Sequence, residues 1–278
     1  MIDNKKIQSA IRILKFAEKE AAQFNEPVEI AYSGGKDSDV LLQLAKESGI
    51  NFKAYYKNTT IDPAGTIQHV RENNVEVVRA KTTFFKLIEK KGFPSFRFRF
   101  CCQELKEYKI LNTACWGVRA DESPKRKKRY KSFEFCRTYN AKEKAHVFLP
   151  IWDWNLNDIK KFTLDRKLKL APIYYDERGN KDFSRRLGCL ACPLKSDRGV
   201  KDFSENHALL RAYLRAGAKF FESHYSNQQK FKDVYELFLF RTFFKDTEKF
   251  KESFLSANLF NDKINSKEFL ENYFDCKL

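Results

Sequence analysis

The chain has no long apolar stretch. A helix that crosses a membrane needs about 20 consecutive apolar residues, and no such run occurs among the 278 residues. The first six residues, Met1 to Lys6, lack the apolar centre of a secretory signal peptide. No internal repeat or low-complexity segment is present. We therefore expect a globular, cytoplasmic protein with no membrane partner.

Acidic residues are in short supply relative to basic ones. The chain has 37 Asp and Glu against 53 Lys and Arg, so its formal charge is +16. Aromatic residues make up 15% of the chain, which is typical of a globular protein and not of a disordered one. A solvated basic surface accounts for the charge, and so does a polyanionic partner such as DNA or RNA. A nucleotide site alone would explain only a few of these charges.

The common phosphate-binding motif Gly-x4-Gly-Lys-Ser/Thr is also absent, but a different glycine turn is present. Val28 to Tyr32 is short, apolar and β-prone, and an apolar helix is expected from Val40 onward. A strand that ends in a glycine turn and opens a helix forms an anion site, because the backbone can approach the ligand and the first helical amides point at it. The six residues of this turn are Ser33, Gly34, Gly35, Lys36, Asp37 and Ser38.

Further strands and helices alternate after this turn. Strands are expected at 52–56, 75–78 and 114–118, and a helix at 64–73. This order predicts a doubly wound α/β fold with a mostly parallel sheet, in which ligands bind at the carboxyl ends of the strands. Thr59, which follows the second strand, is therefore expected to face the same site as the turn. We expect residues 1–199 to form this nucleotide-binding domain with the cysteines, and residues 200–278 to form a helical appendage.

Two basic segments stand out. The run Lys125 to Arg129 follows the fourth predicted strand, a position that favours contact with phosphate over a purely solvated loop. Residues 96–100 alternate Phe and Arg, and we interpret them as an edge strand with Phe inward. The alternative is a surface on which Arg contacts phosphate and Phe stacks on bases.

Four of the seven cysteines occur as two pairs. Cys101 and Cys102 are adjacent at an expected helix start, and Cys189 and Cys192 form a Cys-x-x-Cys loop. Without an export signal, metal ligation is a better explanation for such pairs than disulfides. The pattern alone leaves zinc, an iron–sulfur cluster and redox thiols open. Cys115 is expected in the core.

Three motifs in this order resemble the phosphoadenosine-phosphosulfate (PAPS) reductase family of the adenine-nucleotide α-hydrolase-like PP-loop superfamily. They are Ser33-Gly-Gly-Lys-Asp-Ser38, the segment Gly117-x-Arg119-x-x-Glu-Ser123-x-x-Arg126, and the cysteine pairs, and the resemblance covers about residues 26–195. It implies that Gly117, Arg119, Ser123 and Arg126 contact the phosphate or sulfate end of the nucleotide. The cysteine pattern is similar to that of iron–sulfur adenylyl-sulfate reductases, which implies a [4Fe–4S] cluster, with zinc as the lesser possibility.

Two departures from the family pattern affect the expected reaction. Asn58-Thr59-Thr60 stands where Asp-Thr-Gly is usual, and the late Glu-Cys-Gly-(Leu/Ile)-His motif is missing, with Cys276 as the sole late cysteine. We therefore favour attack at the α-phosphate of ATP, with Mg²⁺, coupled to sulfur transfer. The loop, the segment after the second strand and the cysteine pairs resemble those of the DNA phosphorothioation sulfurtransferase subunit. Lys36 and Asp37 are the expected catalytic residues.

Two other functions stay open at this point. The first is reduction of adenylyl sulfate or PAPS to sulfite, with thioredoxin as partner in place of a cysteine-desulfurase-type sulfur donor. The second is a non-catalytic module that binds a nucleotide or nucleic acid.

Overall fold

The computed structural model describes residues 2–130, 132–139, 143–225, 231–243 and 265–278. The chain divides into two compact units that interleave along the sequence. The first comprises Met1–Asn58, Asp62–Arg79 and Glu107–Leu187, and the second comprises Thr59–Ile61, Ala80–Lys106 and Gly188–Leu278. The domain boundary expected at residue 199 stays a prediction.

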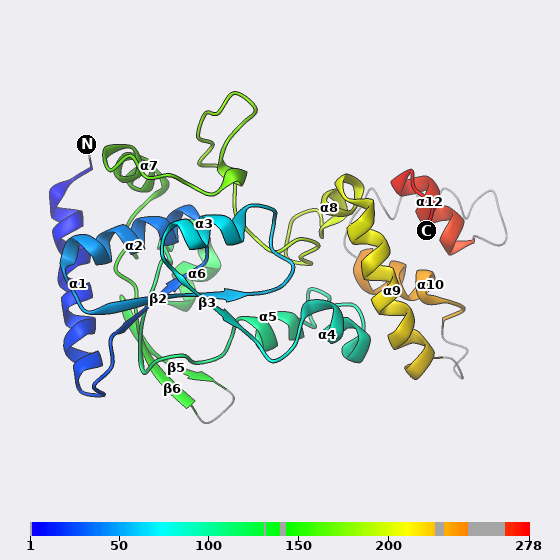
Figure 1. Ribbon diagram of the computed structural model, residues 1–278, viewed down its shortest axis with the longest axis horizontal. Coiled ribbons are helices and arrows are strands. Elements are labelled where there is room, and N and C mark those ends of the chain that lie inside the picture. Colours follow the sequence, from blue (N-terminus) through cyan, green and yellow to red (C-terminus); the bar gives the residue numbers. More distant parts are fainter. Residues whose placement is uncertain (1, 131, 140–142, 226–230, 244–264) are drawn as a thin grey trace. The chain divides into compact units, whose positions relative to one another are not determined.

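The first unit contains a six-stranded sheet with flanking helices (Figure 1). Its strands are β1 (Val28–Tyr32), β2 (Phe52–Asn58), β3 (Glu76–Arg79), β4 (Thr113–Trp116), β5 (Glu134–Tyr139) and β6 (Glu143–Phe148). Its helices are α1 (Asn4–Ala22), α2 (Lys36–Ser48), α3 (Thr66–Glu72), α6 (Pro124–Arg129) and α7 (Leu156–Asp165), with short 3₁₀ turns η1 (Ala120–Glu122) and η2 (Pro172–Tyr174).

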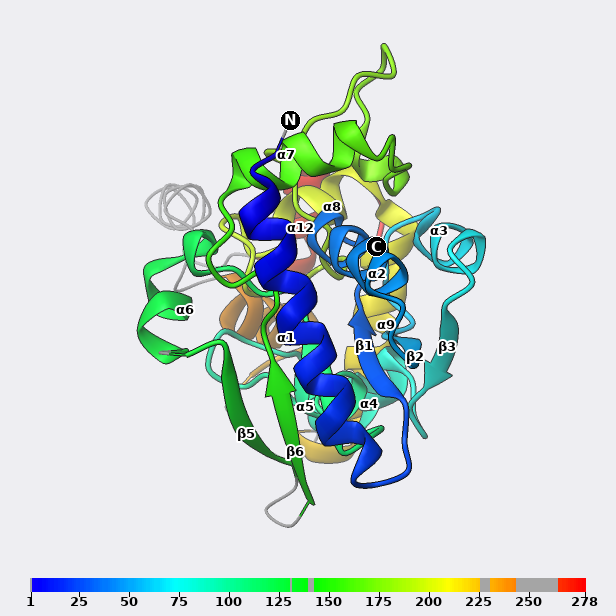
Figure 2. The same ribbon diagram turned by 90° about the vertical axis from the view of Figure 1, so that its left-hand side faces the viewer.

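The strand order is β3-β2-β1-β4-β6-β5, and Figure 2 shows β5 and β6 on one side of β1 with β2 and β3 on the other. All neighbouring strands are parallel except β5, which pairs antiparallel with β6. The predicted mostly parallel α/β fold is therefore confirmed. Strands β5 and β6 were not predicted.

The order of the strands marks one place in the sheet. From β1 the chain proceeds outward to β2 and β3, and it returns to the opposite side of β1 with β4. The loops after β1 and β4 therefore diverge at the point where the strand order reverses, which is where sheets of this kind bind ligands. Ser33 to Gly35 and Gly117 to Arg119 are these two loops.

One apolar core holds the helices on the sheet in this unit. It includes Leu14 of α1, Leu41 of α2 and Phe162 of α7, together with the strand residues Ile30 and Phe148, all fully buried. Asp3 caps α1 as predicted, because its carboxylate accepts the Lys5 amide at 2.9 Å. The core thus fixes the start of α2, where the glycine turn lies.

The second unit is helical. Its elements are α4 (Phe84–Lys91), α5 (Phe100–Leu105), α8 (Val200–Glu205), α9 (His207–His224), α10 (Val234–Phe238), the π-turn η3 (Leu239–Phe243) and α12 (Ser266–Phe274). Its core is aromatic: Phe93 stacks on Tyr213 with ring centroids 5.2 Å apart, and Phe203 meets Tyr213 edge-on at 5.0 Å. Gly217 is necessary here, since a Cβ would stand 2.0 Å from Phe93 Cζ.

The edge strand predicted at residues 96–100 is wrong. Residues 96–99 form an irregular exposed turn, and Phe100 begins α5. The physical reason is local: Ser95 and Phe98 exchange two backbone hydrogen bonds of 3.1 Å, which close the turn on itself. The predicted cap of the last helix is confirmed, since the Asn265 side chain accepts the Lys267 and Glu268 amides. Residues 226–230 and 244–264 of the predicted appendage lie outside the described residues.

Among the described helices, none combines the length and the apolar character required to cross a lipid bilayer.

Candidate functional site

The glycine turn after β1 is closed by its own hydroxyl groups. Gly34 adopts a left-handed backbone with φ of +74°. The Ser38 hydroxyl donates to the Gly35 carbonyl at 2.7 Å and lies 3.2 Å from the Ser33 hydroxyl. The Gly35 amide donates to Ser33 Oγ at 3.4 Å. These bonds hold the turn in one shape at the start of α2, with Ser33 exposed and both glycines buried.

Close packing explains why glycine stands at two positions. A Cβ on Gly34 would lie 3.2 Å from Leu187 and 3.3 Å from Thr66. A Cβ on Gly117 would lie 3.0 Å from the carbonyl oxygen of Asp37 and 3.3 Å from the Ser38 amide nitrogen. The loop after β4 thus rests directly on the backbone of the first turn of α2. The structure brings Gly117 and the glycine turn together, as the sequence predicted.

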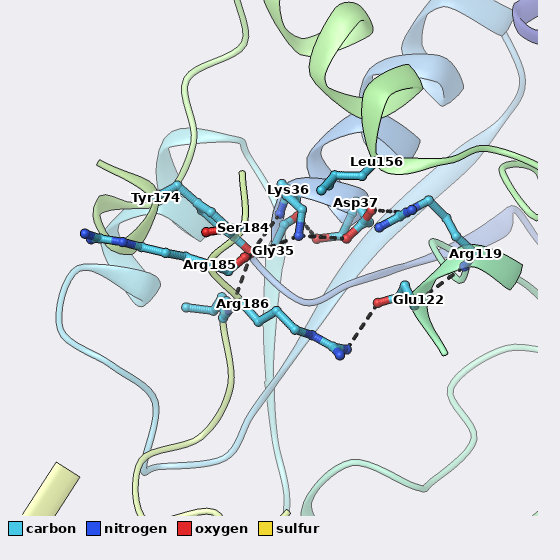
Figure 3. Close-up of polar contacts among 12 residues, drawn as sticks. Gly35, Lys36, Asp37, Arg119, Glu122, Leu156, Tyr174, Ser184, Arg185 and Arg186 are labelled. Carbon is cyan, nitrogen blue, oxygen red and sulfur yellow. Dashed lines mark hydrogen bonds and ion pairs between the residues drawn. The ribbon is translucent and has the colours of Figure 1, made fainter. Parts of the chain in front are cut away.

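Two cations are paired with one carboxylate at the helix start (Figure 3). Asp37 Oδ1 accepts Arg119 Nε at 2.5 Å, and Asp37 Oδ2 lies 3.6 Å from Lys36 Nζ. Lys36 and Arg119 are almost completely buried, with 4% and 3% of their surfaces exposed. Asp37 therefore positions both cations beside the glycine turn.

A second group of charges surrounds Glu122. Its carboxylate accepts a hydrogen bond from Arg126 and lies 3.2 Å from Arg186 Nη2. The Ser123 hydroxyl accepts the Arg126 amide at 3.2 Å and caps α6. In this structure Ser123 and Arg126 are thus engaged within their own segment, and their predicted contact with a nucleotide stays a prediction.

Tyr174 and residues 185–187 were not predicted as part of the site. The Tyr174 hydroxyl accepts the Lys36 amide at 3.3 Å and the Leu187 amide at 3.2 Å. The Lys36 ammonium donates to the Arg185 carbonyl at 3.3 Å and lies 5.4 Å from the centroid of the Tyr174 ring. Burial raises the pKa of Tyr174, so the hydroxyl stays protonated. No sequence motif marks these residues; their position is set by the tertiary fold.

A buried carboxyl lies one turn further along α2. Asp39 Oδ1 accepts the Tyr32 hydroxyl and lies 2.9 Å from His69 Nε2 of α3. Burial raises the pKa of Asp39, although the hydrogen bonds from His69 and Tyr32 act in the opposite direction. This group ties β1, α2 and α3 together behind the glycine turn.

Thr59 and the four paired cysteines lie in the second unit. The Cys189 thiol donates to Thr59 Oγ1 at 3.5 Å. Cys101 and Cys102 lie in the first turn of α5, and all four thiols are half-buried. A hydrogen bond with Cys102, burial, and the neighbouring thiols of Cys102, Cys189 and Cys192 raise the pKa of Cys101. The other three thiols all act on the pKa of Cys101, so the four cysteines are neighbours in the second unit, and their predicted role as metal ligands stays a prediction.

The donor set of this group, four thiols, suits either a [4Fe–4S] cluster or a single zinc ion. Among the described residues, no three His, Cys, Asp or Glu side chains stand in a group that could hold a metal ion. Cys101, Cys102, Cys189 and Cys192 would hold such a cluster or ion, and the choice between cluster and zinc stays a prediction.

Cys276, the late cysteine, lies in a different chemical environment. Burial raises the pKa of its thiol, and the carboxylates of Glu271 and Asp275 raise it further against the effect of Arg211. Nucleophilic cysteines require the opposite, a lowered pKa. Cys115 is fully buried in β4, as predicted.

Comparison with known proteins shows the family to which the sequence belongs. Residues 27–195, more than half of the chain, match the phosphoadenosine phosphosulfate reductase domain. The chain belongs to this family. An uncharacterized protein of Methanocaldococcus jannaschii, MJ0973, is 29% identical over 185 residues, which are 61% of this chain and 42% of that protein. The chain spans less than half the length of the two curated relatives it matches.

Two solved structures with low sequence identity are also similar. Phosphoadenylyl-sulfate reductase from Candida auris has a TM-score of 0.42 and 14% identity, over 59% of this chain and 82% of that chain. The U34-tRNA thiolase NcsA from Methanococcus maripaludis, solved with its [4Fe–4S] cluster, has a TM-score of 0.41 and 13% identity, over 82% of this chain and 83% of that chain.

Proposed function

We propose that this PAPS reductase family protein is a PP-loop enzyme that cleaves ATP at its α-phosphate to activate an acceptor for sulfur transfer. The observation that carries the proposal is the ion group at the start of α2. Lys36 and Arg119 are buried cations held on Asp37 beside a glycine turn, and family membership makes an adenine nucleotide the expected anion.

The proposed reaction uses the loop as a holder for the leaving group. An oxygen of the acceptor attacks the α-phosphorus, the bond from that phosphorus to the bridging oxygen breaks, and pyrophosphate leaves. Negative charge grows on the leaving phosphates, where the turn amides and Lys36 stabilise it, and Mg²⁺ bound with ATP neutralises part of it. Arg119 is free to contact the α-phosphate once the nucleotide displaces Asp37. A sulfur nucleophile then attacks the activated carbon of the acceptor and releases AMP.

The cysteine group supplies the sulfur chemistry in this proposal. Cys101, Cys102, Cys189 and Cys192 would hold a [4Fe–4S] cluster, which when bound provides iron that can carry a sulfur atom. A cysteine-desulfurase-type protein is the expected sulfur source. Nucleic acid is the acceptor class that suits a net charge of +16.

Two other functions fit less well. A sulfonucleotide reductase needs a thiolate that attacks the sulfur of adenylyl sulfate and is later released by thioredoxin. Cys276 has a raised pKa and two nearby carboxylates, which is unfavourable for such a thiolate. A non-catalytic binding module would use the buried Lys36–Asp37–Arg119 group for nucleotide binding alone, and membership of an enzyme family favours catalysis over it.

The discriminating assay incubates protein purified without oxygen with ATP, adenylyl sulfate or PAPS, each with and without RNA or DNA. Pyrophosphate release from ATP supports the proposal, sulfite release with thioredoxin supports the reductase, and no turnover supports the binding module. Lys36→Met should abolish pyrophosphate release. Lys46→Met, an exposed lysine on the same helix, is the matched control and should retain it.

A further inference from the structure

The turn at residues 95–99 in the second unit presents two aromatic rings to solvent. Phe96 and Phe98 are 45% and 48% exposed, and they lie two residues apart in the same turn. Ser95 and Phe98 exchange two backbone hydrogen bonds of 3.1 Å, and the Phe98 amide also lies 3.2 Å from the Ser95 hydroxyl. The turn is therefore closed, and the two rings are held out by a fixed backbone.

Each of the two rings contacts another side chain of the second unit. The Phe98 ring meets the buried Phe100 ring edge-on, with centroids 5.2 Å apart. The guanidinium carbon of Arg198 lies 4.8 Å from the centroid of the Phe96 ring. These contacts reduce the entropy that the rings would lose on binding a flat partner.

The charge around the turn is strongly positive. Between residues 80 and 106, Lys and Arg outnumber Asp and Glu; the basic residues are Lys81, Lys86, Lys90, Lys91, Arg97, Arg99 and Lys106, and the acidic ones are Glu89 and Glu104. Both acidic side chains are already paired, with Lys219 at 2.8 Å and with Lys91 at 2.7 Å. Arg97 and Arg99 are exposed, and neither forms an ion pair in the part of the chain that the structure describes.

We propose that this aromatic-basic turn, Ser95 to Arg99, binds an unpaired strand of RNA, with Phe96 and Phe98 stacking on bases and Arg97 contacting phosphate. Aromatic rings that alternate with basic side chains are the features that bind single strands without sequence preference. In duplex DNA the bases are stacked inside the helix, whereas folded RNA exposes unpaired bases in loops. RNA is therefore the nucleic acid that offers unpaired bases on which Phe96 and Phe98 can stack.

The turn directly precedes Cys101 and Cys102 in the same unit. A strand that lies on it is thus held next to the proposed sulfur-carrying cysteines. The inference rests on the proposed function in one respect only, namely that the bound RNA is the sulfur acceptor. Binding of RNA itself does not depend on ATP cleavage.

The test measures binding of a fluorescent, mixed-sequence single-stranded RNA of roughly 12 nucleotides to the full chain, without nucleotide. Phe96→Ala and Phe98→Ala should each raise the Kd roughly 5- to 150-fold. A plot of the logarithm of the association constant against the logarithm of the salt concentration has a negative slope, and Arg97→Gln should make that slope shallower by about 0.7. The matched controls are Phe24→Ala, at an exposed Phe of the first unit, and Arg12→Gln, which should leave the Kd and the slope nearly unchanged.

Three outcomes would overturn the inference. The first is an unchanged Kd in the Phe96 and Phe98 variants while their melting temperatures equal that of the wild type. The second is duplex DNA that binds as tightly as the single strand. The third is an equal loss in the Phe24 control. Lys36→Met separates the two proposals, since it should abolish pyrophosphate release and keep RNA binding. Loss of RNA binding in this variant would contradict this inference, whereas retained pyrophosphate release would contradict the proposed function.

Discussion

Replacing Gly117 by alanine tests whether the loop after β4 shapes the glycine turn. The added Cβ would stand 3.0 Å from the Asp37 carbonyl oxygen and 3.2 Å from its carbonyl carbon. Both atoms belong to backbone, so no side chain can rotate away to relieve the contact. The backbone of Gly117 is not left-handed, and alanine therefore adds crowding without torsional strain.

The expected cost follows from these contacts. Overpacking of a well-filled site costs about 1–3 kcal/mol, and alanine regains about 0.4–1 kcal/mol by restricting the unfolded chain. We therefore expect the free energy of unfolding to fall by about 1 kcal/mol. If the first turn of α2 yields, the Asp37 carboxylate leaves its 2.5 Å contact with Arg119. ATP binding should then weaken by about tenfold, or about 1.4 kcal/mol.

Chemical denaturation gives the stability and titration calorimetry gives the affinity for ATP. Gly188→Ala is the matched control, because no atom lies within 4 Å of the Cβ it would add, and both quantities should stay close to the wild type. If Gly117→Ala bound ATP as tightly as the wild type, contact between the two loops would have no bearing on the site.

Three further predictions concern the buried and reactive groups. Cys276→Ser should retain full pyrophosphate release. In the wild type, burial raises the pKa of the Cys276 thiol above 9.0, so the alkylation rate of Cys276, followed by peptide mass spectrometry, should keep increasing above pH 9. A plateau below about pH 8 would argue for an activated nucleophile. Cys101→Ala should lose the iron and acid-labile sulfide of protein purified without oxygen, whereas Cys136→Ala, at an exposed cysteine of β5, should retain both. Burial raises the pKa of Asp39 above 3.8, so the folded state binds the carboxyl proton more tightly than the unfolded state does. The free energy of unfolding of the wild type, measured with urea, should therefore fall relative to that of Asp39→Asn as the pH rises from 3.8 through the raised pKa. A constant difference between the two proteins across that range would show that the pKa of Asp39 is not raised.

Local sequence patterns were sufficient for the parts of the fold that depend on local chemistry. The apolar run Val28 to Tyr32, the caps at Asp3 and Asn265, and the order of strands and helices predicted the α/β fold. The edge strand β5 was missed because the side chains of Glu134 to Tyr139 are mostly part-exposed and show no clear apolar face. The exposed Phe-Arg turn was misread for the opposite reason, since its alternation mimics a strand.

The motifs of the candidate site can be recognised in the sequence, whereas its tertiary contacts cannot. Gly117 and Arg119 meet the glycine turn as expected, because both loops lie where the strand order reverses. Tyr174 and Leu187 reach the turn only through the folded chain. The interleaving of segments 80–106 and 188–278 in one unit is likewise set by aromatic packing between distant segments, which no local pattern encodes.

The most direct test of the central claim is the affinity of the glycine turn for ATP in two alanine variants with the same backbone strain. Gly34 and Gly179 have φ of +74° and +79°, but a Cβ on Gly34 would contact Leu187 and Thr66, whereas a Cβ on Gly179 would meet no atom within 4 Å. Titration calorimetry should show a marked loss of ATP binding for Gly34→Ala and none for Gly179→Ala. Equal, undiminished binding in both variants would show that the nucleotide does not bind at this turn.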